Sequence, residues 1–232
     1  MAIAAGQGTG EYCVDIVMCI DATGSMAPII NEVKNNALMF HQKFIDVMEE
    51  DGKEVAALRI KVIVFRDYIC DSEPMVESPF YILPDKNAAF KSFISNIEAC
   101  GGGDEPENAL EAVALAIKSN WTTAGSKRRH VIVMFSDASA LELGERKDCP
   151  NYPKDLPKTI TELRNWWEGK DQYLKSTYQR AAGRFIAFVP TNKQPWNKMD
   201  NWERYWPVNS SAGTGLSEID IQTVIKLITG SI

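Results

Sequence analysis

Val14-Asp-Ile-Val-Met-Cys-Ile20, followed directly by Asp21-Ala-Thr-Gly-Ser25, is the most informative stretch of the sequence. Its first seven residues form a short, mostly apolar run, which is typical of a strand buried on both faces of a sheet. Asp21 and the turn residues after it end the run. Strands of this kind occur in parallel sheets that helices cover on both sides, so the stretch favours an α/β fold.

The residues after Ser25 continue with helical spacing. Apolar side chains recur at steps of three and four from Met26 to Val47, which predicts a long amphipathic helix with Pro28 in its first turn. Elsewhere the patterns predict strands at 58–65, 131–135 and 185–189, and helices at 88–97, 109–117, 160–178 and 219–228. The remaining segments are expected to be an irregular stretch at 74–84 with one extended edge piece, a rim loop at 141–157 and an aromatic loop at 196–206.

Strands that alternate with helices imply a doubly wound, mostly parallel central sheet flanked by helices. We find no internal repeat and no linker that would divide the chain. The expected organisation is a flexible amino-terminal segment at 1–12 and a single domain at 13–232.

Composition narrows the function classes. The 232 residues include 25 Lys and Arg against 31 Asp and Glu, a net charge of −6, which argues against nucleic acid as a partner. The five cysteines form no C-x-x-C pair and are expected to be reduced thiols. No signal-peptide pattern and no apolar run of roughly 20 residues is visible, so we expect a cytoplasmic protein without a membrane span.

Oxygen-bearing side chains are expected to meet at the carboxyl ends of the strands, where ligands bind in open α/β sheets. Asp21, Thr23 and Ser25 follow the first strand, Asp104 precedes a helix, and Asp137 follows the strand at 131–135. Carboxylates and hydroxyls without neighbouring His or Cys suit hard cations such as Mg²⁺ or Mn²⁺. The alternative is that Asp21 and Asp104 cap helices while the two hydroxyls serve a turn.

The stretch Asp21-Ala-Thr-Gly-Ser25-Met26 resembles the D-x-S/T-G-S motif of von Willebrand factor type A (VWA) domains, which carry a metal-ion-dependent adhesion site (MIDAS). The segments 65–68, 101–107 and 136–138 are similar to the variant in intracellular, often bacterial, members and in those attached to alpha-kinases. The resemblance implies a Rossmann-like fold. It also implies that Thr23 and Ser25 bind the ion through their hydroxyls, and that Asp21 and Asp137 bind it directly or through water.

Asp104 departs from the integrin-like pattern, which has threonine as the ligand from the later loop. A further carboxylate would bind the ion more tightly but weaken its attraction for an anionic partner. The site is therefore expected to be a structural or switching centre as much as a capture site. Whether the ion is Mg²⁺, Mn²⁺ or Ca²⁺ stays open.

The resemblance implies a non-catalytic protein-interaction module that binds a divalent cation and, at the same edge, a protein partner, which can belong to a multiprotein assembly. One alternative is an Mg²⁺-dependent phosphotransferase or phosphatase with Asp21 as nucleophile. Such enzymes need a second acid two residues later, where this chain has Thr23. The other alternative is a metal-independent scaffold. The sequence does not define the oligomeric state.

Three further features are expected to have structural roles. Asp67 and Arg66 are expected to take part in a plain surface ion pair; the alternatives are that Asp67 lies in the outer shell of the metal site or that Arg66 pairs with the acidic site. The segment 127–129 is interpreted as a solvated basic loop. The tryptophans near the carboxyl terminus are interpreted as core and rim packing.

Overall fold

A computed structural model describes residues 11–103 and 105–210, apart from the side chains of Asn36, Ala37, Phe40 and His41. The predictions for 1–10, for Asp104 and for the helix at 219–228 lie outside these residues.

In this part of the chain a seven-stranded sheet has the order β3-β2-β1-β5-β6-β7, and β4 also pairs with β2. The strands are β1 Tyr12–Asp21, β2 Val55–Phe65, β3 Met75–Glu77, β4 Tyr81–Leu83, β5 Lys127–Phe135, β6 Gly183–Val189 and β7 Tyr205–Asn209. The pairs β1–β2, β1–β5, β5–β6 and β6–β7 are parallel, whereas β3 and β4 run antiparallel to β2. The mixed, mostly parallel sheet confirms the predicted fold class.

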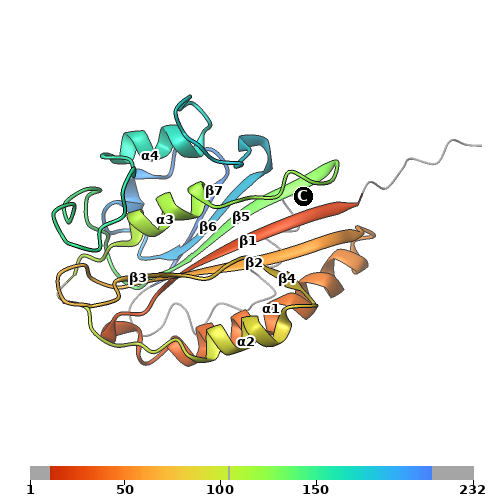
Figure 1. The fold of residues 1–232 in the computed structure, drawn as a ribbon, viewed down its shortest axis with the longest axis horizontal. Helices are drawn as coiled ribbons and strands as arrows, with labels where there is room; N and C mark the ends of the chain where they lie inside the picture. The colour runs from red at the N-terminus through yellow and green to blue at the C-terminus, as the bar shows by residue number, and fades with distance from the viewer. Residues whose placement is uncertain (1–10, 104, 211–232) are drawn as a thin grey trace, which may run out of the picture.

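The sheet is covered on both faces (Figure 1). The helices are α1 Ile30–Glu50, α2 Asn87–Ser95, α3 Ala109–Lys118 and α4 Ile160–Trp167, with short 3₁₀ turns η1 Gly24–Met26, η2 Arg180–Ala182 and η3 Trp196–Lys198. α1 and α2 close one hydrophobic core against the sheet, and α3 and α4 close the other. All ten residues of β1 are buried between β2 and β5, as the apolar run at 14–20 predicted.

The edges of the sheet are short. β3 and β4 have three residues each and both pair with β2. At the other edge β7 has five residues and pairs with β6, with Pro207 in its middle opposite Ala187. β7 begins at Tyr205, so its first two residues lie in the segment 196–206 that is predicted as a loop. The prediction was wrong at its end because the alternation of a short edge strand is hidden among the aromatic residues.

Two helix predictions need correction. The first helix begins at Ile30, and the residues from Gly24 to Met26 form η1 instead, so Pro28 precedes the helix. The predicted helix at 160–178 ends at Trp167, because Gly169 adopts a positive φ of 63° that terminates it.

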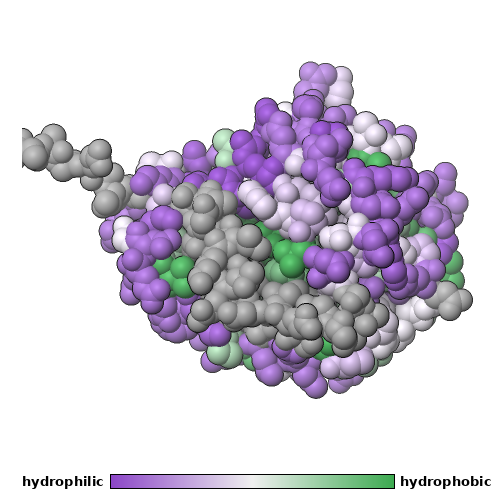
Figure 2. Space-filling model, turned by 180° about the vertical axis from the view of Figure 1, so that it is seen from behind, coloured by the Kyte–Doolittle hydropathy of each residue, from purple (hydrophilic) through white to green (hydrophobic). Residues whose placement is uncertain are grey.

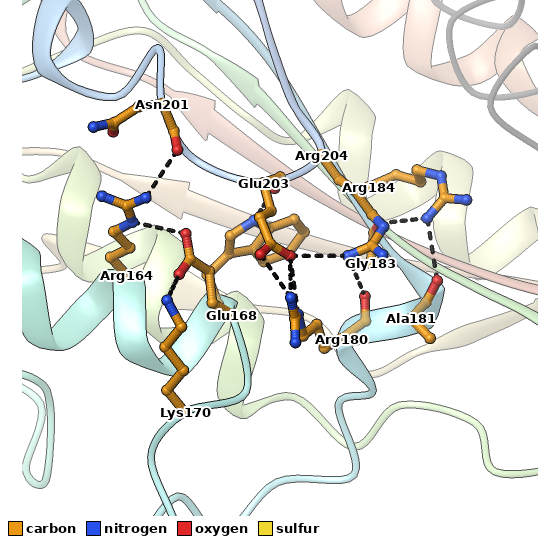
Figure 3. Close-up of polar contacts among 11 residues, drawn as sticks. Arg164, Glu168, Lys170, Arg180, Ala181, Gly183, Arg184, Asn201, Glu203 and Arg204 are labelled. Atoms are coloured by element: carbon orange, nitrogen blue, oxygen red, sulfur yellow. Dashed lines mark hydrogen bonds and ion pairs between the residues drawn. The ribbon is translucent and has the colours of Figure 1, made fainter.

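An ion-pair network fastens the carboxyl end of α4 (Figure 3). The buried Glu168 accepts a hydrogen bond from Arg164 Nε at 2.7 Å and a further one from Lys170. Arg180 donates to both carboxylate oxygens of Glu203, just before β7. Because Trp167 Nε1 also donates to Glu203 O at 2.6 Å, these contacts join α4, η2 and the residue pair before β7 at the end of the sheet where the parallel strands begin.

The basic segment Lys127–Arg129 is not a solvated loop. It is the first part of β5, partly buried, and both Lys127 and Arg129 lie over the ring of Tyr12, 5.0 and 5.5 Å from its centroid. The tryptophan prediction is confirmed, because Trp166, Trp167, Trp196 and Trp202 are buried.

The described surface carries few large exposed apolar side chains: Met39, Ile69, Ile82 and Tyr173. Figure 2 shows that the described part of the rear face is mostly hydrophilic, with small separate hydrophobic areas. Of the described helices, none is both long and apolar enough to cross a membrane.

Candidate functional site

The site lies at the carboxyl ends of β1 and β5, on the left of Figure 1. Asp21 is the last residue of β1 and is fully buried. Its Oδ1 accepts hydrogen bonds from the Thr23 backbone N–H at 3.0 Å and from Thr23 Oγ1 at 2.6 Å. The second oxygen, Oδ2, accepts from Ser136 Oγ at 2.7 Å. The turn after β1 and the end of β5 therefore converge on one carboxylate.

Ser25 connects this carboxylate to a second one. Its Oγ lies 3.2 Å from Thr23 Oγ1 and donates to Asp137 Oδ1 at 3.0 Å. Ser25 is exposed while Thr23 and Asp137 are buried, so solvent reaches the cluster on the Ser25 side. Four of the predicted metal-site residues are thus brought together: Asp21, Thr23, Ser25 and Asp137. The fifth, Asp104, lies outside the described residues.

A glycine loop forms the adjoining wall. Cys100 N–H donates to Ala22 O at 3.0 Å, and Gly24 N–H donates to Gly101 O at 3.1 Å. Gly102 has a φ of 75°, and a Cβ placed on it would lie 2.9 Å from Thr23 Cβ. Only glycine allows the loop to approach Thr23 this closely.

Glu107 is the site residue that sequence reasoning missed. A carboxylate directly before a helix can act as a cap, but α3 begins at Ala109 and the side chain of its N-cap residue Asn108 makes no capping hydrogen bond. Instead, the Glu107 backbone pairs with the loop after β5, donating to Ser139 O at 2.9 Å and accepting from Leu141 N–H at 2.8 Å. Its side chain is 3% exposed and Oε2 has no partner among the described residues.

The available signal for Glu107 was its place in Gly101-Gly-Gly-Asp-Glu-Pro-Glu107, directly before the predicted helix. A capping carboxylate and a buried site carboxylate share that spacing, so the sequence alone could not separate them. The structure adds that a Cβ on Gly102 would lie 3.4 Å from Glu107 Oε1 as well as against Thr23. Glu107 therefore borders the same cluster.

The pKa values of the carboxyl groups in the cluster indicate that a positive charge placed among them would be stabilised. Burial raises the pKa of Asp21 to about 6, although its bonds from Thr23 and Ser136 act in the opposite direction. Burial, and then the charges of Asp21, Asp67 and Asp137, raise the pKa of Glu107 to about 8. Burial also raises the pKa of Asp137. A cation placed among these groups would stabilise their charged forms and so lower the raised pKa values.

Asp67 does not form the predicted surface ion pair. It is 3% exposed, and its Oδ1 accepts from the backbone N–H groups of Ile69 and Cys70. Arg66 instead donates to Glu98 O at 2.7 Å. Asp67 thus holds the loop after β2 in place and adds negative charge near Glu107.

The donor set suits a hard divalent cation in part. Asp137 Oδ2 and Glu107 Oε2 are buried and have no hydrogen-bond partner within the described residues, so each has a free acceptor. Two hydroxyls and up to three carboxylates are oxygen donors of the type that Mg²⁺, Mn²⁺ and Ca²⁺ take. No group of three or more His, Cys, Asp or Glu side chains in the described part of the chain is already arranged to hold a metal ion. Hydroxyls and water would have to complete the coordination.

The fold and this polar strand-end cluster together define an α/β domain with its candidate binding edge beyond the sheet. Residues 15–148 match the family model of the von Willebrand factor A domain. The chain therefore belongs to the von Willebrand factor A domain family, as its motifs suggested.

Individual relatives are more distant. The chain is 26% identical over 158 residues to the alpha-protein kinase vwkA of Dictyostelium discoideum, a match that covers 64% of this chain and 22% of the kinase. The chain thus spans about a fifth of the length of that curated relative.

Solved structures share the fold at low identity. The pilus adhesin SpaC from Lactobacillus rhamnosus GG aligns with a TM-score of 0.57 at 11% identity, over 94% of this chain and 31% of the adhesin. Proximal thread matrix protein 1 from the mussel byssus aligns with a TM-score of 0.52 at 12% identity, over 96% of this chain and 48% of that protein. A von Willebrand factor type A protein from Catenulispora acidiphila gives 0.51 at 12% identity, over 94% and 43%.

Proposed function

We propose that this domain is a non-catalytic interaction module that binds a divalent cation at the strand-end cluster and a protein partner over it. The observation that carries the proposal is the hydrogen-bonded series Asp21–Thr23–Ser25–Asp137, in which two hydroxyls connect two buried carboxylates and neither carboxylate forms an ion pair within the described residues. VWA domains are typically interaction modules and often bind divalent cations at this edge.

The residues of the cluster would have different roles in binding the cation. Thr23 and Ser25 would bind the ion through their hydroxyls, and Asp137 would bind it through an oxygen that has no other partner. Asp21 accepts three hydrogen bonds and so fixes the orientation of Thr23. From behind the direct ligands, its negative charge would help to balance the charge of the cation. When bound, the cation would supply a Lewis-acid position for a carboxylate of the partner.

The same geometry disfavours the phosphotransferase alternative. Both Asp21 oxygens accept hydrogen bonds, and the residue is fully buried, which leaves a poor nucleophile for an incoming phosphate. The segments similar to alpha-kinase-attached members, and the match to vwkA, favour a partner within a multiprotein assembly.

Thermal unfolding in EDTA and after addition of Mg²⁺, Mn²⁺ or Ca²⁺ tests the metal site. At about 100 times the dissociation constant, the preferred cation should raise the midpoint of wild type by roughly 5–10 °C. Asp21→Asn and Ser25→Ala should lose most of this rise. Asp46→Asn, on the exposed face of α1, serves as the matched control and should keep it.

Equal midpoints with and without each cation would contradict the metal-binding proposal and favour the scaffold alternative. Mg²⁺-dependent release of phosphate from a simple phosphate ester, abolished by Asp21→Asn, would instead favour the enzyme. The two experiments therefore separate the three function classes.

A further inference from the structure

A small apolar pocket opens beside the candidate metal site. It has a volume of about 220 Å³ and lies between the loop after β5, the start of α4 and the segment that leads into η3. Its walls include Ala140, Leu143, Ile160 and Pro195, with Leu110 of α3 at its side. Leu110, Leu143 and Pro195 are buried, so these walls are held by the core of the domain and not by loose surface side chains.

The size of the pocket restricts its occupant. Sites for whole small molecules usually measure roughly 300–1,000 Å³, which is more than this pocket offers. A dry cavity of about 150 Å³ already accommodates a benzene ring. The pocket is therefore matched to one large apolar side chain.

The rim of the pocket is basic. Lys158 and Lys198 are exposed at its mouth, and Glu142 is the acid among its lining residues, while Glu162 beside the mouth accepts a hydrogen bond from the Lys158 backbone N–H at 2.7 Å. Lys198 Nζ bonds only the neutral Gln194 side chain, at 3.1 Å, and neither lysine has an ion-pair partner in the described part of the chain. The lysines therefore outnumber the acid among the lining residues, and because neither side chain is engaged in an ion pair, both can bind carboxylates of an acidic partner segment.

The pocket and the metal site share a wall. Ala140 lines the pocket and forms the isolated bridge with Glu107, which borders the metal cluster. Asp137 is three residues before Ala140, so their Cα atoms are at most about 11 Å apart. An extended segment of about four residues would span the two positions.

We propose that the pocket receives a large apolar side chain of an extended, acidic partner segment, with flanking carboxylates on Lys158 and Lys198. In the same segment a carboxylate about three or four residues away would reach the metal cluster. This second contact rests on the proposed function, whereas the pocket contact stands on its own residues.

A labelled synthetic peptide tests the pocket directly. The probe has a central phenylalanine with glutamates on both sides, and its binding to the full chain is followed by fluorescence anisotropy with Mg²⁺ and with EDTA. Replacing the phenylalanine by alanine should weaken binding at least about tenfold. Replacing the glutamates by glutamine should also weaken it and remove its salt dependence.

Protein variants locate the contact. Ala140→Leu narrows the pocket, and Lys158→Glu with Lys198→Glu reverses its rim, so each should weaken the phenylalanine peptide several-fold or more. The matched control is Lys86→Glu with Lys91→Glu. Both lysines are exposed, one at the N-cap of α2 and one within that helix, on the opposite face of the sheet, so this variant should bind like wild type. The rim variant changes only exposed side chains, so it still tests the pocket if Ala140→Leu does not fold.

The outcomes separate the two proposals. Discrimination between the phenylalanine and alanine peptides that persists in EDTA and in Asp21→Asn, but is lost in the pocket variants, supports the pocket even if the metal proposal fails. Equal binding of the two peptides, unchanged binding by the pocket variants, or no binding at millimolar peptide overturns it.

Discussion

Two buried aspartates of the same strand show how the ends of β1 differ. Asp15, near its beginning, accepts Arg59 Nε at 2.7 Å and the Thr122 backbone N–H. Asp21, at its end, accepts hydrogen bonds from hydroxyls and one amide but faces no cationic side chain among the described residues. A buried carboxylate with only neutral donors is costly, so the arrangement at Asp21 indicates a role other than stability.

Glu107→Gln should separate the stability of the metal-free protein from its affinity for metal. In EDTA at pH 7 the variant removes a carboxyl group that burial and neighbouring acids disfavour in its charged form. The free energy of unfolding should therefore rise by roughly 1–2 kcal/mol, and the midpoint by a few degrees. The affinity for the preferred cation, measured by calorimetry, should fall.

Glu49→Gln is the control, because Glu49 is exposed in the last turn of α1, away from the cluster. It should change both quantities little. A loss of stability in Glu107→Gln without any change in metal affinity would mean that Glu107 serves the packing of its loop alone.

For single residues, the sequence predicted four members of the strand-end cluster but not Glu107, which borders it. Asp21, Thr23, Ser25 and Asp137 follow strand ends, and the rule that parallel strands end at one edge was enough to bring them together. Glu107 was missed because its location depends on pairing with Ser139 and Leu141, which no local pattern encodes.

At the level of elements, α3 is joined to the rim loop at 141–157 by a buried acid. Tyr152 Oη donates to Glu111 Oε1 at 2.8 Å, and Glu111 is fully buried. Burial raises the pKa of Glu111 to about 7 from its ordinary value of 4.5, against the effect of the Tyr152 bond. The loop that borders the candidate site is thus held by a group that titrates near neutral pH.

The Glu111 carboxyl should make stability depend on pH in a defined direction. Its pKa is higher in the folded than in the unfolded chain, so the folded form retains the proton between about pH 4.5 and 7 while the unfolded chain loses it. Its contribution is complete below 4.5 and falls as pH rises through this range, by up to about 1.4 kcal/mol per unit. Urea unfolding of wild type and Glu111→Gln across pH 4.5–8 measures the difference, which should grow with pH in favour of the variant. A constant difference would contradict the assignment.

The anchor of α4 gives the second prediction at this scale. Burial acts to raise the pKa of Glu168, but hydrogen bonds and charges of Lys170 and Arg164 prevail and lower it. Glu168→Gln should lower the free energy of unfolding at pH 7 by about 1–2 kcal/mol. The pKa of Glu168 is lower in the folded than in the unfolded chain, so its charged form stabilises the fold fully only above the pKa of the unfolded chain. The loss of stability in the variant should therefore shrink as pH falls below about 4. Glu50→Gln, exposed at the carboxyl end of α1, is the control for chemical denaturation.

Helices and strands were predictable to different degrees. The long apolar runs in β1, β2 and β5 left little freedom, because they suit only a strand buried on both faces. The end of α4 and the start of β7 were not found, because the glycine after Trp167 and the pairing with β6 outweigh an apolar spacing that continues to Tyr178.

For the whole molecule, the parallel sheet predicts a gradient of local stability. β1 is central, and each of its residues is buried, so its amides should open only when the domain unfolds as a whole. Hydrogen exchange followed by mass spectrometry should show β1 and β5 exchanging slowest, and β3, β4 and β7 at least tenfold faster. Equal protection across the sheet would contradict this order.

The fold class followed from the alternation of strands and helices over the whole chain, which is a global property that single local errors do not disturb. The strand order did not follow from that alternation. It depends on β2 and β5 flanking β1 and on β3 and β4 turning back onto β2, which are long-range pairings between segments whose own sequences are compatible with other neighbours.

The shortness of the sheet edges has a consequence for behaviour in concentrated solution. A long exposed strand edge recruits strands from other copies, which leads to aggregates. Here the outer strands are three, three and five residues long, and Pro207 lacks the N–H that an added strand would need from the middle of β7. Within the described residues, the sheet therefore offers little template for uncontrolled self-assembly when the protein is concentrated.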